Sequence, residues 1–233
     1  DDFAKYGKRA DQRRIEKVLA KIPLLVGGKF KFSSVDREDR SRELGRALDM
    51  LFLARVAHRV RHTAANGVPL GAEADERSFK VLFMDVGLLC RSCGLSVLDV
   101  EGAGDVMLVN SGAVCEQFVG QHLLYAGEPY AEPELHCWMR EKSQSSAEVD
   151  YVVPVGGKIV PVEVKAGRTG TLKSMQVFLR EKELDFGLRF NADVPSLLDA
   201  ETSLAVGGNK PFRLLSLPLY MVGQALRLCR ENA

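Results

Sequence analysis

The sequence has no apolar run of about eighteen residues, and it does not open with a charged, apolar and small-residue signal segment. We therefore expect a cytoplasmic chain with no membrane partner. Cysteine is scarce: the five residues are odd in number and irregularly spaced, which argues against a disulfide framework. Cys90 and Cys93 form one C-x-x-C pair, but no second pair completes the four ligands of a zinc site.

A nucleotide-binding P-loop is also missing. Gly27 and Gly28 directly precede Lys29, and Gly207 and Gly208 precede Asn209 and Lys210, yet neither segment follows the pattern G-x-x-x-x-G-K-[ST]. No ATPase activity is expected from this chain, so any ATP would bind through residues outside it.

The near-neutral net charge of +1 hides an asymmetry between the two halves. Residues 1–93 hold 19 Lys and Arg against 13 Asp and Glu, whereas residues 94–233 hold 13 against 18. Basic residues crowd a helix predicted at 11–25, and those assigned to nucleic-acid contact are Arg9, Arg13, Arg14 and Lys17. Three roles stay open for this face: binding phosphates, facing solvent, or docking on another domain.

Hydrophobic periodicity predicts an N-terminal helical module over residues 1–98. Helices are expected at 11–25, stopped by Pro23 or by Gly27 and Gly28, and at 39–54, followed by strands at 55–61 and 78–84. Two helices and a two-stranded wing resemble a winged helix, a shape that binds DNA in some proteins and packs against protein in others.

The second predicted domain covers residues 99–233, with its boundary in the glycine-containing stretch 94–104 after a short helix at 85–93. Its expected elements are given by residue range: a helix at 106–124, a strand–turn–strand hairpin around 148–165, a helix at 172–183, strands at 188–191 and 212–217, and a closing amphipathic helix at 219–229. Residues 187–210 are polar enough to predict an irregular surface segment.

The hairpin carries the chemistry. Asp150 lies on its first strand, and Glu163 and Lys165 lie two residues apart on its second, so they share one face while Val162 and Val164 point to the other. Glu116, on the preceding helix, adds a third carboxylate. Glu116, Asp150 and Glu163 form a hard-oxygen set suited to Mg²⁺ or Mn²⁺, and Lys165 would orient a nucleophile or offset charge on a phosphoryl group.

This acid, acid, Lys signature resembles the PD-(D/E)xK nuclease superfamily. The segments around it, at 111–119, 135–140, 148–153 and 159–167, look like the domain of unknown function behind the ATPase in prokaryotic AAA-type ATP-binding proteins. Residues 29–33, 41–44, 69–70 and 79–89 resemble the linking region of the same family. The resemblance implies an α/β (α+β) fold, with a restriction-endonuclease-like mixed sheet flanked by helices, in a C-terminal fragment whose partner is the ATPase domain.

In related nucleases a residue on the next helix assists the site, which assigns Lys173 and Gln176 to phosphate or water contact, with ordinary solvent-facing roles as the alternative. Trp138, the only tryptophan, is expected in the core. Two functions remain open. One is a metal-dependent nuclease in which Glu116, Asp150, Glu163 and Lys165 are catalytic; the other is a non-catalytic nuclease-like module that couples the ATPase to a protein or nucleic acid.

Overall fold

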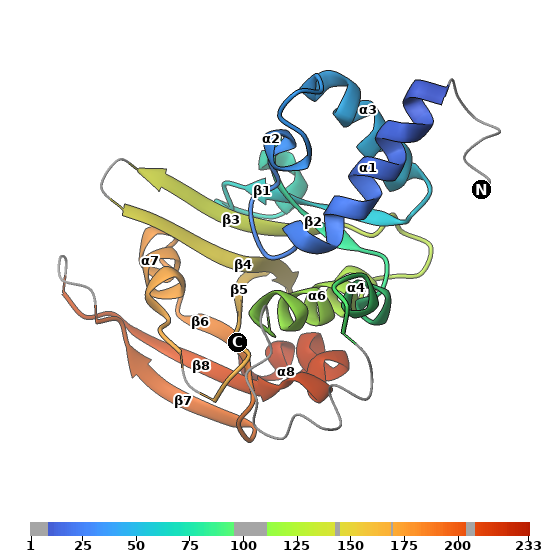
Figure 1. Cartoon of the computed structure of the whole chain (residues 1–233). Helices are drawn as coiled ribbons and strands as arrows, with labels where there is room; N and C mark the ends of the chain where they lie inside the picture. Colours follow the sequence, from blue (N-terminus) through green and yellow to red (C-terminus); the bar gives the residue numbers. More distant parts are fainter. Residues whose placement is uncertain (1–8, 96–110, 143–144, 169, 204–207) are drawn as a thin grey trace.

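The computed structural model describes residues 9–95, 111–142, 145–168, 170–203 and 208–233. Its fold is α+β: one eight-stranded mixed sheet in the order β2-β1-β3-β4-β5-β6-β8-β7, flanked by helices (Figure 1). The strands are β1 (Ala57–Thr63), β2 (Ala74–Phe83), β3 (Leu135–Lys142), β4 (Ser145–Val155), β5 (Lys158–Val164), β6 (Phe186–Asn191), β7 (Ser196–Glu201) and β8 (Pro211–Pro218).

The described helices are α1 (Arg9–Leu25), α2 (Phe32–Val35), α3 (Ser41–Leu53), η2 (Leu70–Glu73), α4 (Val86–Ser92), α6 (Ser111–Leu124), α7 (Lys173–Glu181), η3 (Leu219–Gln224) and α8 (Ala225–Asn232). None of them is long and apolar enough to cross a membrane. The predicted domain boundary falls in residues 96–110, which lie outside the described part of the chain.

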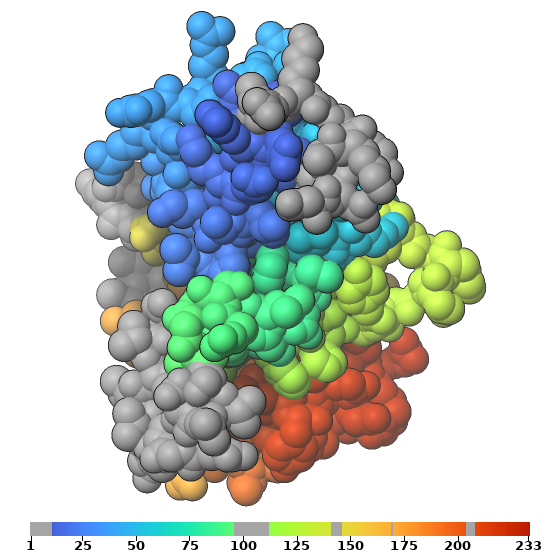
Figure 2. All heavy atoms as spheres, turned by 45° about the vertical axis from the view of Figure 1, so that its right-hand side comes forward, coloured from blue at the N-terminus to red at the C-terminus, as the bar shows by residue number. Residues whose placement is uncertain are grey.

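The sheet is continuous across the two predicted domains. The antiparallel hairpin β1–β2 belongs to the N-terminal region, and β1 also pairs in parallel with β3. Figure 2 shows the blue N-terminal helices directly against the green segment that contains α4. The expected wing is therefore also the edge of the main sheet.

Alternation along β2 divides the core between the two faces of the sheet. Phe79, Val81 and Phe83 pack with α1 and α3 in one buried cluster, whereas Leu82 packs with α6 in another. Farther along the sheet, α7 places Phe178 against Trp138, with ring centroids 5.1 Å apart. Trp138 is buried, as expected for a core residue.

Strand β4 contains one extra residue relative to β3. Val149 pairs with Trp138 and Val152 pairs with His136. Two residues of β4 therefore lie between these pairs, opposite a single residue of β3. Val149 and Val152 both pack in the cluster that contains Phe178, while Tyr151 packs with α6. This irregularity is a β-bulge, and it occurs beside Asp150, where the direction of the side chains changes.

Two details differ from the sequence prediction. Strand β7 forms within residues 187–210, which were expected to be irregular. Its side chains are mostly exposed, so its sequence shows no alternation of apolar and polar residues that would predict a strand. The closing helix begins as the 3-10 turn η3 before α8. Helix α1 ends at Leu25, as predicted, and of the two stops that were expected it passes Pro23 and ends before Gly27.

Candidate active site

The hairpin β4–β5 brings Asp150 beside the end of β5, as the sequence predicted. Tyr151 pairs with Val162, and the Asp150 Oδ2 atom accepts a hydrogen bond of 2.8 Å from the Val164 backbone N–H. Lys165 follows β5 directly, and its backbone N–H donates to the Phe190 carbonyl at 2.8 Å, which continues the pairing with β6. The Asp150 carboxylate is thus tied to the backbone of β5, and the backbone of Lys165 is tied to β6.

Glu163 and Lys165 are in direct contact. The Lys165 Nζ atom lies 2.5 Å from the Glu163 Oε1 atom, which confirms that the two side chains share a face. Glu163 is 5% exposed, and its second oxygen, Oε2, is buried without a hydrogen-bond partner. A buried carboxylate oxygen with no donor costs free energy, so this atom marks a place where a cation or a proton is needed.

The pKa values of the carboxyl groups respond to this burial. Desolvation, and then the charge of Asp150, raise the pKa of Glu163 to about 7. Burial likewise raises the pKa of Asp150, against the opposing effect of Lys80. Both groups would be more readily ionised if a divalent cation were bound between them.

The fourth predicted residue, Glu116, has a different partner. Its Oε1 atom accepts a hydrogen bond of 2.8 Å from Lys80 Nζ, and Lys80 also contacts Glu148 and lies 3.7 Å from Asp150 Oδ1. Tyr151 of β4 fixes helix α6 at this point, because its hydroxyl donates a hydrogen bond of 2.8 Å to the Glu116 backbone carbonyl. Burial is the main cause that raises the pKa of Glu116 to about 7.

Lys80 is the residue that the sequence analysis missed. It lies on β2, is 1% exposed, and faces α6 because it alternates with Phe79 and Val81. Burial opposes its charged form, but the charges of Glu116, Asp150 and Glu148 outweigh it and raise the pKa of Lys80 well above the ordinary value. Nothing in the spacing of one lysine on one strand would have marked it.

The expected three-carboxylate metal site is therefore not formed as predicted. Within the described residues, no group of three or more His, Cys, Asp or Glu side chains is arranged to hold a metal ion. The ammonium of Lys80 lies among Glu116, Glu148 and Asp150 instead. The donors that fit a divalent cation are Asp150 and the unpartnered Oε2 of Glu163, both hard oxygens.

The region opens to the surface at Glu148, whose side chain is 39% exposed. A cavity of about 270 Å³ adjoins it and is lined in part by Lys29, Arg140 and Ser174. Glu148 lines the same cavity, and Arg140 forms an ion pair with Glu181, so both signs of charge meet at this opening.

Of the predicted helper residues, Gln176 accepts a hydrogen bond of 3.1 Å from the Ser203 backbone N–H, on the side of β7 and β8. That contact gives it a structural role. Lys173 is exposed on the first turn of α7. No contact of either residue with Asp150 or Glu163 is found among the described side chains.

The basic face of α1 is partly neutralised inside the module. Arg14 Nε donates to both carboxylate oxygens of Asp39, at 3.0 and 3.1 Å, and Lys17 contacts Asp36. Arg13 is exposed, and the side chain of Arg9 is outside the described part. Two of the four residues predicted to contact nucleic acid on this helix, Arg14 and Lys17, therefore have their charge paired with carboxylates of the same module.

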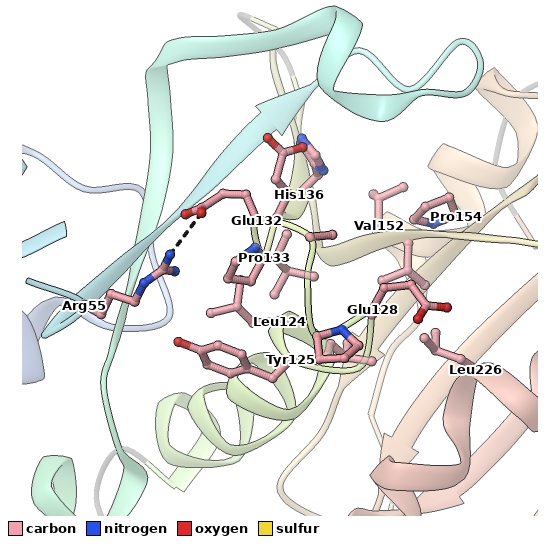
Figure 3. A pocket seen from close by; sticks show the side chains of 17 residues that line it. Arg55, Leu124, Tyr125, Glu128, Glu132, Pro133, His136, Val152, Pro154 and Leu226 are labelled. Carbon is pink, nitrogen blue, oxygen red and sulfur yellow. Dashed lines mark hydrogen bonds and ion pairs between the residues drawn. The ribbon is translucent and has the colours of Figure 1, made fainter. Parts of the chain in front are cut away.

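A larger cavity, of about 580 Å³, lies away from these carboxylates (Figure 3). Arg55 and Glu132 form an ion pair of 2.9 Å at its edge, and Leu124, Val152 and Leu226 supply apolar lining. It contains none of the predicted catalytic residues, so its size does not make it the candidate site.

The five cysteines are free thiols, including Cys90 and Cys93. Both of these pack against the N-terminal core, and the Cys93 thiol lies 3.8 Å from the Pro23 carbonyl. A structural position accounts for the C-x-x-C spacing.

The fold and the site define an α+β protein in which a mixed sheet carries an acidic cluster with two lysines. The family model described as a domain of unknown function (DUF4143) matches residues 111–195, and a second, described as a domain of unknown function (DUF8612), matches residues 1–99. Comparison with curated proteins gave no match. Comparison with solved structures gave none either.

Proposed function

We propose that this chain carries a divalent-cation-dependent phosphodiesterase site of the nuclease type, in the C-terminal region of an AAA-type ATP-binding protein. The observation that carries the proposal is Glu163: a buried carboxylate with one oxygen paired to Lys165 and the other without a partner, beside Asp150. The four residues of the acid, acid, Lys set lie within the range 111–195 that the first domain of unknown function matches.

Asp150 and Glu163 would hold Mg²⁺ or Mn²⁺. The chemistry that such a cation supplies is polarisation of a phosphoryl oxygen and activation of a water molecule as nucleophile. Lys165 keeps its ammonium at Glu163, where it would orient the nucleophile or stabilise negative charge on the phosphoryl oxygens.

The test is cleavage of single-stranded, duplex and branched DNA and RNA with Mg²⁺, with Mn²⁺ and with EDTA. Lys165→Ala removes the ammonium at the site, whereas Lys158→Ala is a matched control at the exposed start of the same strand. Metal-dependent cleavage that persists in Lys158→Ala and falls at least about a hundredfold in Lys165→Ala supports the proposal. Equal cleavage by both variants would contradict it.

A second candidate function is the non-catalytic interaction module. The observation that favours it is Lys80, which pairs with Glu116 and Glu148 and so provides those carboxylates with a partner that needs no metal. This candidate predicts that the wild-type chain neither binds Mn²⁺ nor cleaves any substrate of the panel, and that Glu163→Gln leaves its partner binding unchanged.

A further inference from the structure

Lys80 is a charged group buried at the centre of an acidic cluster. A buried lysine ordinarily loses its proton, because removal from water penalises the ammonium. Here three carboxylates surround it: Glu116 at 2.8 Å, Glu148 in contact, and Asp150 at 3.7 Å. The geometry is that of a cation held by oxygen donors from one helix and one strand.

The charges of the whole site favour one further cation. Four carboxylates take part, those of Glu116, Glu148, Asp150 and Glu163, against the two ammonium groups of Lys80 and Lys165. With all six groups ionised, four negative and two positive charges leave a net charge of −2, which one divalent ion neutralises. The independent sign of a missing ligand is Oε2 of Glu163, an unpartnered oxygen on a side chain that is 5% exposed.

Lys80 also comes from a different part of the chain than its partners. It belongs to the region 1–99 that one family model matches, whereas Glu116, Glu148 and Asp150 belong to the region 111–195 that the other matches. The N-terminal region thus completes the acidic site of the C-terminal region.

We infer that Lys80 is a resident cation of this site, supplied by the N-terminal region in the place of a second divalent ion, and that the site accepts one divalent ion, at Asp150 and Glu163. The number of ions rests on the proposed function, while the role of Lys80 does not. Removing the ammonium leaves Glu116, Glu148 and Asp150 without their cation, and these oxygen donors then become a site for a metal ion.

The experiment is titration of the folded chain with Mn²⁺ alone, followed by calorimetry and by the electron paramagnetic resonance of free Mn²⁺. We expect about one Mn²⁺ per chain for the wild type and about two for Lys80→Gln. In the variant, a Mn²⁺ ion would take the place of the deleted ammonium among the three carboxylates. Lys80→Arg keeps the positive charge and is expected to stay at about one. Lys158→Gln, at the exposed start of β5, controls for loss of a lysine elsewhere.

The outcomes separate this inference from the proposed function. One ion in the wild type and two in Lys80→Gln supports both; none in the wild type and one in Lys80→Gln supports the role of Lys80 and overturns the proposed function. One ion in each overturns the role of Lys80 alone, and no ion in either overturns both. A second ion in Lys80→Arg would also overturn the inference.

Lys80→Gln leaves three carboxylates close together, so its folding is a measurement too. If it unfolds in metal-free buffer, recovery of the native near-ultraviolet circular dichroism on refolding with Mn²⁺ supports the inference. Failure to refold with Mn²⁺, while Lys80→Arg folds, would overturn it.

Discussion

Replacement of Glu163 by Gln should stabilise the metal-free protein at high pH. The carboxylate is buried, one of its oxygens lacks a donor, and its pKa is raised from the ordinary 4.5 to about 7 by burial and by Asp150. Between pH 4.5 and about 7, the folded state therefore keeps a proton on Glu163 that the unfolded state has already released. The free energy of unfolding of the wild type falls as pH rises from 4.5 through about 7, and the loss is complete above that range.

The magnitude follows from the size of the shift. One pKa unit corresponds to about 1.4 kcal/mol, so the shift of Glu163 from 4.5 to about 7 sets an upper bound of roughly 3.5 kcal/mol. The amide has no charge to bury, and we expect Glu163→Gln to raise the free energy of unfolding by about 1–3 kcal/mol near pH 8. Near pH 4 the two proteins should be equally stable. Glu116, whose pKa is also raised to about 7, is present in both proteins and cancels from the difference.

The assay is urea unfolding followed by tryptophan fluorescence, since Trp138 is the single tryptophan and is buried. It is run in EDTA across this pH range and then with Mn²⁺. Mn²⁺ at about a hundred times its dissociation constant should stabilise the wild type by about 2.7 kcal/mol and leave Glu163→Gln nearly unchanged. The difference in the free energy of unfolding between the two proteins should therefore shrink or change sign. A Glu163→Gln protein that is less stable than the wild type near pH 8 in EDTA would refute the reasoning.

Two further predictions concern packing and the basic helix. Gly120→Ala should lower the free energy of unfolding by about 1–3 kcal/mol, because the new Cβ would lie 2.3 Å from the Tyr151 hydroxyl oxygen. The control is Gly112→Ala on the same helix, whose Cβ meets nothing within 4 Å and which should be neutral or slightly stabilising. Equal effects of the two substitutions in thermal unfolding would contradict the packing of α6. Arg14→Ala should lower the free energy of unfolding, measured in urea, by about 1 kcal/mol, because it removes two hydrogen bonds to the Asp39 carboxylate. Arg13→Ala is the control and should lower it by less than about 0.5 kcal/mol. A larger loss in Arg13→Ala than in Arg14→Ala would contradict a stabilising role for the Arg14–Asp39 ion pair.

The local pattern of the sequence was sufficient for most elements. Helices such as α3 and strands such as β5 carry their own periodicity, so their existence could be predicted to within a few residues. Strand β7 could not be predicted in this way. It lies at one edge of the described sheet, beside β8, and has mostly exposed side chains, so burial imposes no alternating pattern on it.

The hairpin and the contact of Glu163 with Lys165 could be predicted from the residues alone, because side chains two apart on a strand share a face. The neutralisation of the carboxylates, in contrast, depends on the tertiary packing. Lys80 lies 36 positions before Glu116 in the chain, and α6 packs over β2 so that the lysine is buried among acids from distant segments. That arrangement depends on sheet order and helix packing, which residue spacing along the chain does not encode.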